Sequence, residues 1–237
     1  MGESAQSLRH EFGCRVSHGA KERFIGPDES VVFVVDENLG DRTALAEMLA
    51  RAGIRSIPFA SLGEFMDFPK PNCVSCLLFD LQSPDLDGLE FLERMNKETI
   101  PPIVYVTAHG DIALSVRAMR SGAIDFLPKP LSQAVLLRAV ESAFDHDEVT
   151  RMHKAEKVEL RRRYSLLTPR ERDVLSLVVA GLLNKQSAAQ LGISEITLQI
   201  HRGKVMRKMA AQSLADLVRM EGKLELHGPS RRAAFSR

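Results

Sequence analysis

The stretch VVFVVDENLGDRTALAEMLARAGIRSIPF, residues 31–59, decides the fold of the first half of the chain. Its opening, VVFVV at 31–35, is short, apolar and rich in β-branched residues, which is typical of a strand buried on both faces. Apolar residues then recur at helical spacing until Gly53, which ends the helix, and another apolar segment follows at 54–59. The stretch therefore predicts a strand, a helix and a second strand.

The same alternation continues to about residue 146. Further strands are expected at 75–79, 103–106 and 124–127, and further helices at 61–67, 88–96, 111–121 and from Leu131 onward. Strands that alternate with helices indicate a parallel sheet covered by helices on both faces. Because crossovers between parallel strands are right-handed, the predicted fold class is an α/β doubly wound five-stranded parallel sheet.

The composition places the chain among ordinary globular proteins. At 237 residues it is long enough for two domains, and 44% hydrophobic with 27% charged residues argues against a disordered, collagen-like or membrane protein. No apolar run approaches the roughly 18 residues of a membrane span, and no secretory signal is visible at the amino terminus. Three cysteines are too few to staple a secreted fold, so we expect a cytoplasmic protein without a membrane partner.

The charges divide the chain into an acidic and a basic half. Residues 1–150 carry 14 Lys and Arg against 23 Asp and Glu, a net charge of −9, whereas residues 151–237 carry 18 against 8, a net charge of +10. This asymmetry indicates an acidic module joined to a module that binds a polyanion. The expected segments are a flexible leader at 1–28, the α/β domain at 29–146, a charged linker at 147–164, an all-α domain at 165–226 and a basic tail at 227–237.

The all-α domain is expected to contain four helices. Thr168 and Glu171 have the spacing of a capping box at the start of the first helix, which Gly181 ends. The next three helices are expected to be capped or started by Asn184, Ser194 and Ser213, with the last ending near Gly222. The turn around Gly192 lies between an alanine-rich helix and a basic one, which is the arrangement of a helix-turn-helix.

Polar side chains gather where the predicted parallel strands end. Asp36 and Glu37 follow the first strand, and Asp80 ends the third. One acid after a strand is more often a turn former, but three at the same edge repel one another and call for a cation such as Mg²⁺. Thr107 and Lys129 add a hydroxyl and a positive charge to this edge, which completes a set suited to binding a phosphoryl group.

These segments resemble the receiver domains of bacterial two-component response regulators, which have a flavodoxin-like fold. The matching text is VVFVVDEN at 31–38, LLFDLQSPDLDG at 77–88, PIVYVTAHGD at 102–111 and AIDFLPKP at 123–130. The resemblance implies that Asp80 is the phospho-acceptor for a sensor histidine kinase. It also implies a cis bond between Lys129 and Pro130.

The resemblance assigns a role to each further residue at this edge. Asp36, Glu37, Asp80 and the main-chain carbonyl of Gln82 would hold Mg²⁺. Lys129 and Thr107 would contact phosphoryl oxygens, and Phe126 would change rotamer as the switch. The chain departs from the family in two places, since Glu37 stands where a second aspartate is usual and Ser83 where methionine is common. Neither departure removes a required charge.

The basic third helix of the second domain has two distinct rows. Leu198, His201, Val205 and Met209 recur on the row expected to face inward, which makes His201 a packed or phosphate-touching residue rather than a catalyst. The other row holds Gln199, Ile200, Gly203 and Arg207. A basic helix is often only a solvated face, but the charge division favours DNA.

The region from Leu166 to about Glu221 resembles the LuxR-type helix-turn-helix of FixJ/NarL-class response regulators, through LTPRER at 167–172 and NKQSAAQLGIS at 184–194. The resemblance puts the third helix in the major groove, with Gln199, Ile200 and Gly203 nearest the bases and Lys185, Thr197, Arg202, Lys204 and Arg207 on phosphates. Ile196 is apolar where the class usually has a polar residue, so its role is open. Dimerisation would use Leu214, Leu217 and Val218.

We therefore expect a non-enzymatic response regulator that is phosphorylated on Asp80, forms a homodimer, binds double-stranded DNA and activates transcription, with RNA polymerase as a further partner. One alternative keeps the DNA binding but makes the receiver a phosphorylation-insensitive interaction module. Another is a phosphatase with an aspartate nucleophile, which would need a DxD arrangement after the first strand. The text after that strand is Asp36-Glu37-Asn38, which does not supply it.

Overall fold

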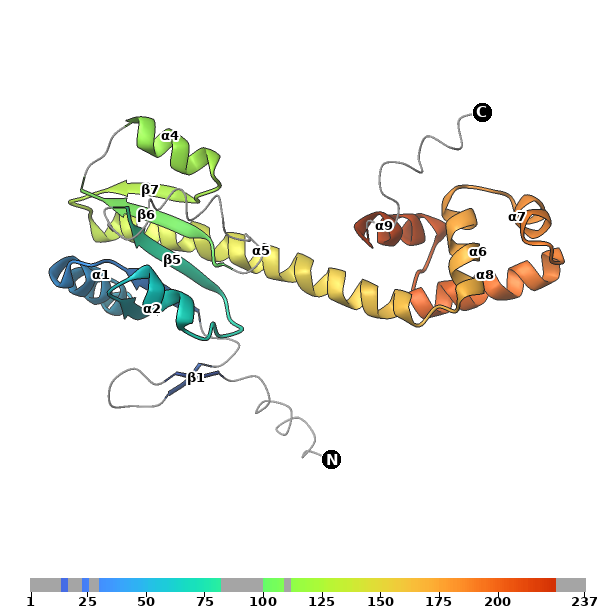
Figure 1. The fold of residues 1–237 in the computed structure, drawn as a ribbon, viewed down its shortest axis with the longest axis horizontal. Helices are drawn as coiled ribbons and strands as arrows, with labels where there is room; N and C mark the ends of the chain where they lie inside the picture. The colour runs from blue at the N-terminus through green and yellow to red at the C-terminus, as the bar shows by residue number, and fades with distance from the viewer. Residues whose placement is uncertain (1–13, 17–22, 26–29, 82–99, 109–111, 225–237) are drawn as a thin grey trace. The chain divides into compact units, whose positions relative to one another are not determined.

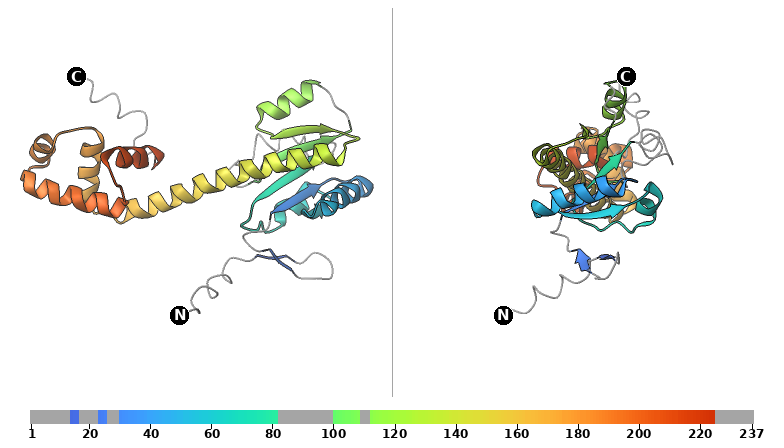
Figure 2. Two further views of the ribbon diagram at one scale, coloured as in Figure 1. Left: turned by 180° about the vertical axis from the view of Figure 1, so that it is seen from behind. Right: turned by 90° about the vertical axis from the view of Figure 1, so that its left-hand side faces the viewer.

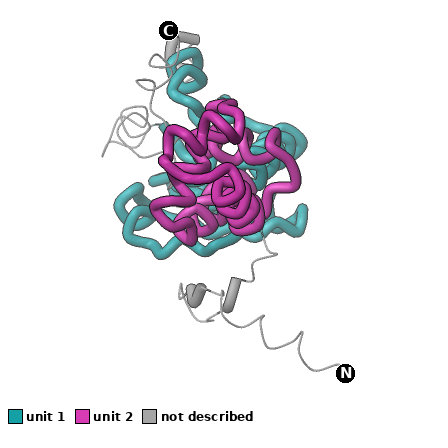
Figure 3. The backbone as a smooth tube through the Cα atoms, turned by 90° about the vertical axis from the view of Figure 1, so that its right-hand side faces the viewer, with its two compact units in different colours: residues 1–150 teal, residues 151–237 magenta. Residues whose placement is uncertain are grey.

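The computed structural model describes residues 14–16, 23–25, 30–81, 100–108 and 112–224. The helix expected at 88–96 lies outside these residues. Within them the chain divides into two compact units, residues 1–150 and 151–237 (Figure 3). Each unit is described separately.

The first unit is built on a five-stranded parallel sheet (Figure 1). Its strands are β3 (Val31–Val35), β4 (Arg55–Phe59), β5 (Ser75–Asp80), β6 (Ile103–Thr107) and β7 (Asp125–Pro128). Their order across the sheet is β4-β3-β5-β6-β7, and every neighbouring pair is parallel. The predicted doubly wound five-stranded sheet is confirmed. All residues of β3, β5 and β6 are buried, as a strand covered on both faces requires.

Helices cover both faces of this sheet (Figures 1 and 2). On one face, α1 (Leu39–Arg51) and the start of α5 (Gln133–Ser165) contribute Leu49 and Leu136 to a core with the inner residues of β3, β5 and β6. On the other face, α2 (Leu62–Asp67) and α4 (Ile112–Arg120) contribute Phe65 and Ala118. The two cores hold the strands rigidly, and thereby fix the side chains at their carboxyl ends.

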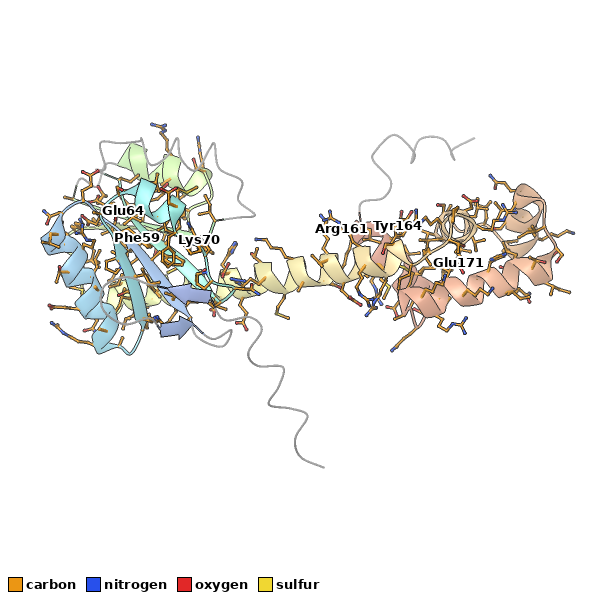
Figure 4. The ribbon with its side chains drawn as sticks, turned by 60° about the horizontal axis from the view of Figure 1, so that its bottom comes forward. Phe59, Glu64, Lys70, Arg161, Tyr164 and Glu171 are labelled. Carbon is orange, nitrogen blue, oxygen red and sulfur yellow. The ribbon has the colours of Figure 1, made fainter. Side chains whose placement is uncertain are left out.

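Aromatic rings fill the core beneath α2. Phe33, Phe59, Phe65 and Phe68 pack with ring centroids 5.2 to 6.2 Å apart and with tilted or edge-on planes. Such pairs are favourable because the positive edge of one ring meets the negative face of another. Lys70 Nζ lies 4.2 Å from the centre of the Phe65 ring and donates to the carbonyls of Phe65, Met66 and Phe68, so it closes the end of α2 (Figure 4).

Residues 147–164, which were expected to form a charged linker, lie within one continuous 33-residue helix, α5. The sequence here has little apolar periodicity, but its Ala, Glu, Lys and Arg residues are strong helix formers. The first residues of this segment make a contact in the first unit, and its last residues pack in the second unit. The buried Asp147 accepts a hydrogen bond from the Ser75 amide at 2.9 Å, and Leu160 is buried in the core of the second unit. The boundary between the units lies inside the helix, after Thr150.

The second unit contains α6 (Pro169–Val179), α7 (Asn184–Leu191), α8 (Glu195–Met209) and α9 (Leu214–Leu224), packed around one core with the end of α5. The capping box of Thr168 and Glu171 is present, and the Ser194 side chain caps α8. Gly181 and Gly192 adopt positive φ where α6 and α7 end. These features confirm the predicted starts of α6 and α8 and the predicted ends of α6 and α7.

One boundary prediction in this unit was wrong. Asn184 does not cap α7: Leu183 holds the cap position, and the Gln186 side chain accepts from its amide. The Asn184 side chain instead accepts a hydrogen bond from Arg202, which explains why it is unavailable for capping. The last helix ends at Leu224, near Gly222 as predicted, and Leu224 is buried in the core.

The leader at 1–28, expected to be flexible, contains a short antiparallel pair, β1 (Cys14–Val16) and β2 (Arg23–Ile25). Both strands carry β-branched or aromatic residues, which favour extended backbone even in an otherwise polar stretch. Among the described residues, no helix combines the length and the apolar composition that a membrane crossing needs.

Candidate functional site

The first candidate site lies at the carboxyl end of the parallel sheet, where four strands end in polar residues. Asp36 directly follows β3, Asp80 ends β5 and Thr107 ends β6, while Lys129 follows β7. The Lys129–Pro130 peptide bond is cis, as the family resemblance implies. Because these strands are neighbours in register, side chains from distant parts of the sequence meet at one edge.

Lys129 is the centre of this cluster. Its ammonium group contacts the Asp36 carboxylate at 2.8 Å, the Asp41 carboxylate at 2.8 Å and the Asp80 carboxylate at 2.9 Å. Asp36 and Asp80 are buried, whereas Asp41 is partly exposed. A buried carboxylate is strongly stabilised by such a charge-assisted hydrogen bond, so Lys129 holds together groups that would otherwise repel one another.

The environment changes the pKa values of two members of the cluster. Burial raises the pKa of Asp36 above its usual value, although the hydrogen bond and charge of Lys129 act in the opposite direction. Burial alone would lower the pKa of Lys129, but the hydrogen bonds to Asp36, Asp41 and Asp80 outweigh it and raise the pKa. Lys129 therefore remains a fixed positive charge throughout the physiological range.

The turn between β3 and α1 positions Asp36 by backbone contacts. Asn38 caps α1, its side chain accepting from the amides of Gly40 and Asp41, and its own amide donates to Asp36 at 2.8 Å. Arg42 donates to the carbonyl of Asp36 at 2.6 Å. These bonds fix the backbone at the end of β3 and place the first turn of α1, with Asp41, beside Lys129.

The composition of the carboxylate cluster differs from the sequence prediction. The group whose ligand oxygens lie within 4.8 Å of one another consists of Asp36, Asp41 and Asp80. Glu37 is exposed and is not part of this group, and Gln82 lies outside the described residues. Sequence reasoning missed Asp41, although an acid in the first turn of the helix after β3 stays close to the sheet edge and could have been considered.

Two further residues that the resemblance assigns to the site, Thr107 and Phe126, lie on the neighbouring strands β6 and β7. Thr107 is buried at the end of β6, and its carbonyl accepts a hydrogen bond from the Lys129 amide at 2.7 Å. Phe126 is partly buried on β7 and packs against the core that lies under α2 and α4. The main chain therefore links Thr107 directly to the residue whose side chain joins the carboxylates.

The cluster has the chemistry of a magnesium site. Mg²⁺ prefers carboxylate oxygens together with water, and Asp36, Asp41 and Asp80 offer three such oxygens close to one another. An aspartate beside a fixed lysine at the edge of a sheet is also suited to attack a phosphoryl group, since the lysine stabilises the negative oxygens. The residues present thus fit a metal-assisted phosphoryl acceptor.

The second candidate site is the surface of α8. Leu198, Val205 and Met209 are buried in the core, as predicted, and the Nδ1 atom of His201 is buried without a hydrogen-bond partner among the described residues. The remaining predicted members are Thr197, which is partly buried, and Gln199, Ile200, Gly203, Lys204, Arg207 and the α7 residue Lys185, which are all exposed. The surface combines cations with polar and apolar side chains, as a DNA-reading surface requires.

Arg202 has a structural role in addition to the one predicted. Its guanidinium donates to the Asn184 side chain at 3.0 Å and so links α8 to the start of α7. Lys208, which lies further along α8, donates to the Glu171 carboxylate at 2.6 Å and to the Leu166 carbonyl at 2.9 Å. The cations of α8 therefore divide into Lys204 and Arg207, which are exposed, and Arg202 and Lys208, which bind within the unit.

The predicted dimer contact on α9 needs one correction. Leu214 and Val218 are 39% and 42% exposed and lie four residues apart on one face. Leu217 is fully buried in the core of its own unit, so it is unavailable to a second chain. The helical period explains the difference, since Leu217 lies on the same inward row as Leu224.

Comparison with known proteins identifies both units. Residues 32–141 match the model of the response regulator receiver domain, and residues 165–221 match that of the bacterial regulatory proteins of the luxR family. The structure is similar to that of the response regulator StyR, with a TM-score of 0.70 and 39% sequence identity, covering 82% of this chain and 99% of that one.

Curated relatives match most of this chain. Nodulation protein W of Bradyrhizobium diazoefficiens is 42% identical over 193 residues, which is 81% of this chain and 85% of that protein. The transcriptional regulatory protein FixJ of Rhizobium meliloti is 40% identical over 191 residues, which is 80% of this chain and 93% of FixJ. The chain belongs to the FixJ-like transcriptional response regulators, which join a receiver domain to a LuxR-type DNA-binding domain.

Proposed function

We propose that the receiver domain accepts a phosphoryl group on Asp80 from the phosphohistidine of a sensor kinase, and that this event controls DNA binding by the second unit. The observation that carries the proposal is the contact of Lys129 with Asp36, Asp41 and Asp80 at distances of 2.8 to 2.9 Å. Ligands of doubly wound sheets bind at the carboxyl ends of the strands, and Lys129 supplies the positive charge there that an anionic ligand needs.

The chemistry assigned to the chain is a transfer between two nucleophiles. An Asp80 carboxylate oxygen attacks phosphorus, the bond between phosphorus and the histidine nitrogen breaks, and the electron pair leaves with the imidazole. Lys129 would offer its ammonium to the phosphoryl oxygens, and the Thr107 hydroxyl would donate to another of them. Asp36 and Asp80, with Asp41 or Glu37 and the Gln82 carbonyl, would hold Mg²⁺, which when bound supplies additional positive charge to these oxygens.

The response is a shift between two populations of the receiver. A phosphoryl group on Asp80 would compete with the neighbouring carboxylates for the Lys129 ammonium, and would also bind Thr107. It therefore favours the form of the receiver in which both residues contact it. The partly buried Phe126 on the neighbouring strand is the residue proposed to change packing. Phosphorylation changes the equilibrium only by its preference for the active form, so DNA affinity rises by the same factor by which that form gains population.

The second unit is proposed to bind DNA as a dimer. Lys185, Lys204 and Arg207 are exposed cations around α8, which supports contacts with phosphates on either side of the major groove. Leu214 and Val218 on α9 are proposed to contact the same residues of a second copy, and two such units would read related half-sites. A regulator bound in this way would act on transcription through RNA polymerase.

Phosphorylation can be tested on the full chain. Incubation with acetyl phosphate and Mg²⁺ should add one phosphoryl group by intact mass spectrometry, and Asp80→Asn should abolish the gain. Asp67→Asn, which changes an exposed aspartate of α2, is the matched control and should retain the gain. No mass gain in the unmodified chain would instead favour a receiver that acts as a phosphorylation-insensitive interaction module.

A further inference from the structure

The outermost row of α8 begins with two exposed isoleucines. Ile196, Ile200, Gly203 and Arg207 recur at intervals of four, three and four residues, so they lie on one face of the helix. The opposite face carries the buried residues of the same helix, Leu198, Val205 and Met209. Ile196 is 72% exposed and Ile200 is 54% exposed. The apolar pair therefore points directly away from the core of the unit.

Packing within the unit does not explain this pair. The core contacts of α8 are made by its buried row, and exposed isoleucine in a helix has only average helix propensity. The pair also lies beside Lys204 and Arg207, two exposed cations of the surface proposed to bind DNA. An apolar pair bordered by cations on such a surface is suited to contact an apolar group that belongs to a polyanion.

The glycine that follows the pair leaves space in front of the helix. A side-chain carbon added at Gly203 would meet no atom of the protein within 4 Å, so packing does not require glycine at this position. Glycine in the middle of a helix costs about 1 kcal/mol relative to alanine. Its presence lets the backbone of α8 approach a ligand closely, just beyond Ile200 on the same row.

The major groove of DNA offers one prominent apolar group to such a row, which is the C5 methyl group of thymine. Gln199 is exposed beside Ile200, and its amide is able to donate to and accept from the base edge of adenine, the partner of thymine. In an A·T pair, the Ile200 side chain can thus contact the thymine methyl group while the Gln199 amide bonds to adenine. Neither isoleucine offers a hydrogen bond to guanine or cytosine.

We propose that Ile196 and Ile200 are specificity-determining residues that contact thymine methyl groups in the major groove. This inference rests on the proposed DNA binding by α8. It gives the half-site a chemical signature, which is dependence on the thymine methyl group itself rather than only on base-pair identity. It also gives a role to Ile196, the more exposed of the two isoleucines.

Replacing thymine with deoxyuridine provides the test, because this change removes the methyl group and keeps every hydrogen bond. A preferred duplex is first selected from random sequences with the phosphorylated full chain, and each thymine is then replaced singly. One or more replacements should weaken binding by about fourfold, the expected cost of losing one buried methyl contact. In Ile196→Ser and Ile200→Ser the cost should disappear at the position that each isoleucine contacts.

Met152→Ser is the matched control, since it removes an equally exposed apolar side chain from α5 and should preserve every methyl effect. The inference is overturned if no thymine replacement affects the unmodified chain, or if the effects persist undiminished in both isoleucine variants. The inference is also overturned if the isoleucine variants change self-association of the protein but keep the dependence on thymine methyl groups. That result would assign the two isoleucines to a contact between proteins. A chain that binds no duplex would contradict the proposed function as well, so the two failures are distinguishable.

Discussion

At the scale of single residues, the acidic cluster contains Asp41 and not Glu37, the metal ligand that the resemblance implies. Asp41 shares Lys129 with Asp36 and Asp80, whereas Glu37 is exposed outside the group. We expect Asp41→Asn to weaken Mg²⁺ binding more than Glu37→Gln does, because only the former removes an oxygen from the cluster. Isothermal titration calorimetry of the two variants makes the comparison, and a larger loss in Glu37→Gln would contradict this arrangement.

A buried serine in α7 provides a test of polar burial. Ser187 is fully buried, and its hydroxyl has no hydrogen-bond partner within the described residues. An unsatisfied buried hydroxyl costs about 1 kcal/mol or more, so Ser187→Ala should raise the free energy of unfolding of the second unit by about that amount. Differential scanning calorimetry of the full chain would show a higher transition temperature.

Ser176→Ala is the control for this change. The Ser176 hydroxyl donates to the Arg172 carbonyl at 3.1 Å, so its removal loses a bond and should not stabilise the unit. If both alanine variants stabilise equally, the higher helix propensity of alanine accounts for the effect, and the buried hydroxyl of Ser187 does not.

The sequence indicates which residues meet at the site where the end of a strand fixes the position of each residue. Asp36, Asp80, Thr107 and Lys129 each follow or end a strand, and parallel strands bring their ends together, so the cluster could be foreseen. Asp41 lies in a helix, and its approach to Lys129 depends on how the first turn of α1 is held by Asn38 and Arg42. The Asn38 cap can be read from sequence, whereas the contact of Asp41 with Lys129 joins residues far apart in the chain, which no local pattern specifies.

At the scale of elements, a carboxylate at the start of α6 joins two helices. Glu171 is buried, accepts from the amide of Thr168 at 2.8 Å and contacts Lys208 of α8 at 2.6 Å. The Lys208 hydrogen bond, followed by that of the Thr168 backbone, lowers the pKa of Glu171 below its ordinary value of 4.5. The pair therefore ties the first helix of the unit to the end of the DNA-facing one.

This lowered pKa makes the stability of the unit depend on pH. A carboxyl group whose pKa is lowered by folding contributes stability above its unfolded pKa, and the contribution is lost as pH falls through the folded pKa. We expect the thermal stability of the second unit to decline below about pH 4.5 and Glu171→Gln to be less stable at pH 7 but less sensitive to that decline. Calorimetry of both proteins from pH 7 to 3 would measure this, and parallel curves would contradict it.

Two adjacent residues of helix α9 differ in burial, since Leu217 lies in the core and Val218 lies on the surface. Leu217→Ala should destabilise the unit by about 2 to 5 kcal/mol, because it leaves a cavity in the core. Val218→Ser should leave the melting temperature nearly unchanged and weaken dimerisation on DNA, because Val218 is exposed. Calorimetry and sedimentation of the DNA complexes would separate the two effects, and a Val218→Ser protein that dimerises normally would exclude α9 from the contact.

Elements were predicted well where apolar periodicity is strong and poorly where it is weak. The strands predicted at 31–35 and 75–79 and the capped helix from Pro169 follow directly from sequence patterns. The continuation of α5 through residues 147–164 does not, because few apolar residues mark its faces and contacts such as Asp147 with Ser75 stabilise it. The start of α7 was misassigned because Asn184 bonds to Arg202, an interaction between distant residues.

At the scale of the whole molecule, the net charges of −9 and +10 on the two halves assign nucleic-acid binding to the second. Affinity for DNA should fall steeply with salt, since each neutralised phosphate adds about 0.9 to the slope of log K against log salt. Lys204→Ala should weaken binding to all sequences and reduce this slope by about 1. Filter binding or fluorescence anisotropy over a salt series measures it, and an unchanged slope would remove Lys204 from the phosphate contacts.

Arg202→Ala provides a contrast in the same series. Arg202 also binds Asn184, so its loss should reduce the thermal stability of the unit as well as DNA affinity. Lys204 makes no comparable contact in the described hydrogen-bond network, and its variant should melt as the unmodified protein does. Equal melting temperatures for all three proteins would show that the bond between α7 and α8 contributes little.

The end of α5 determines where the chain divides into pieces that fold. Leu160 is buried in the second core, Tyr164 stacks with Arg172 at 5.0 Å and Arg163 donates to the Met209 carbonyl at 3.1 Å. A fragment that starts at Leu166, where family resemblance begins, would lack all three. The shortest autonomous DNA-binding fragment therefore begins upstream of Leu160, and a protease that cuts α5 nearer to Thr150 would release it with its core complete.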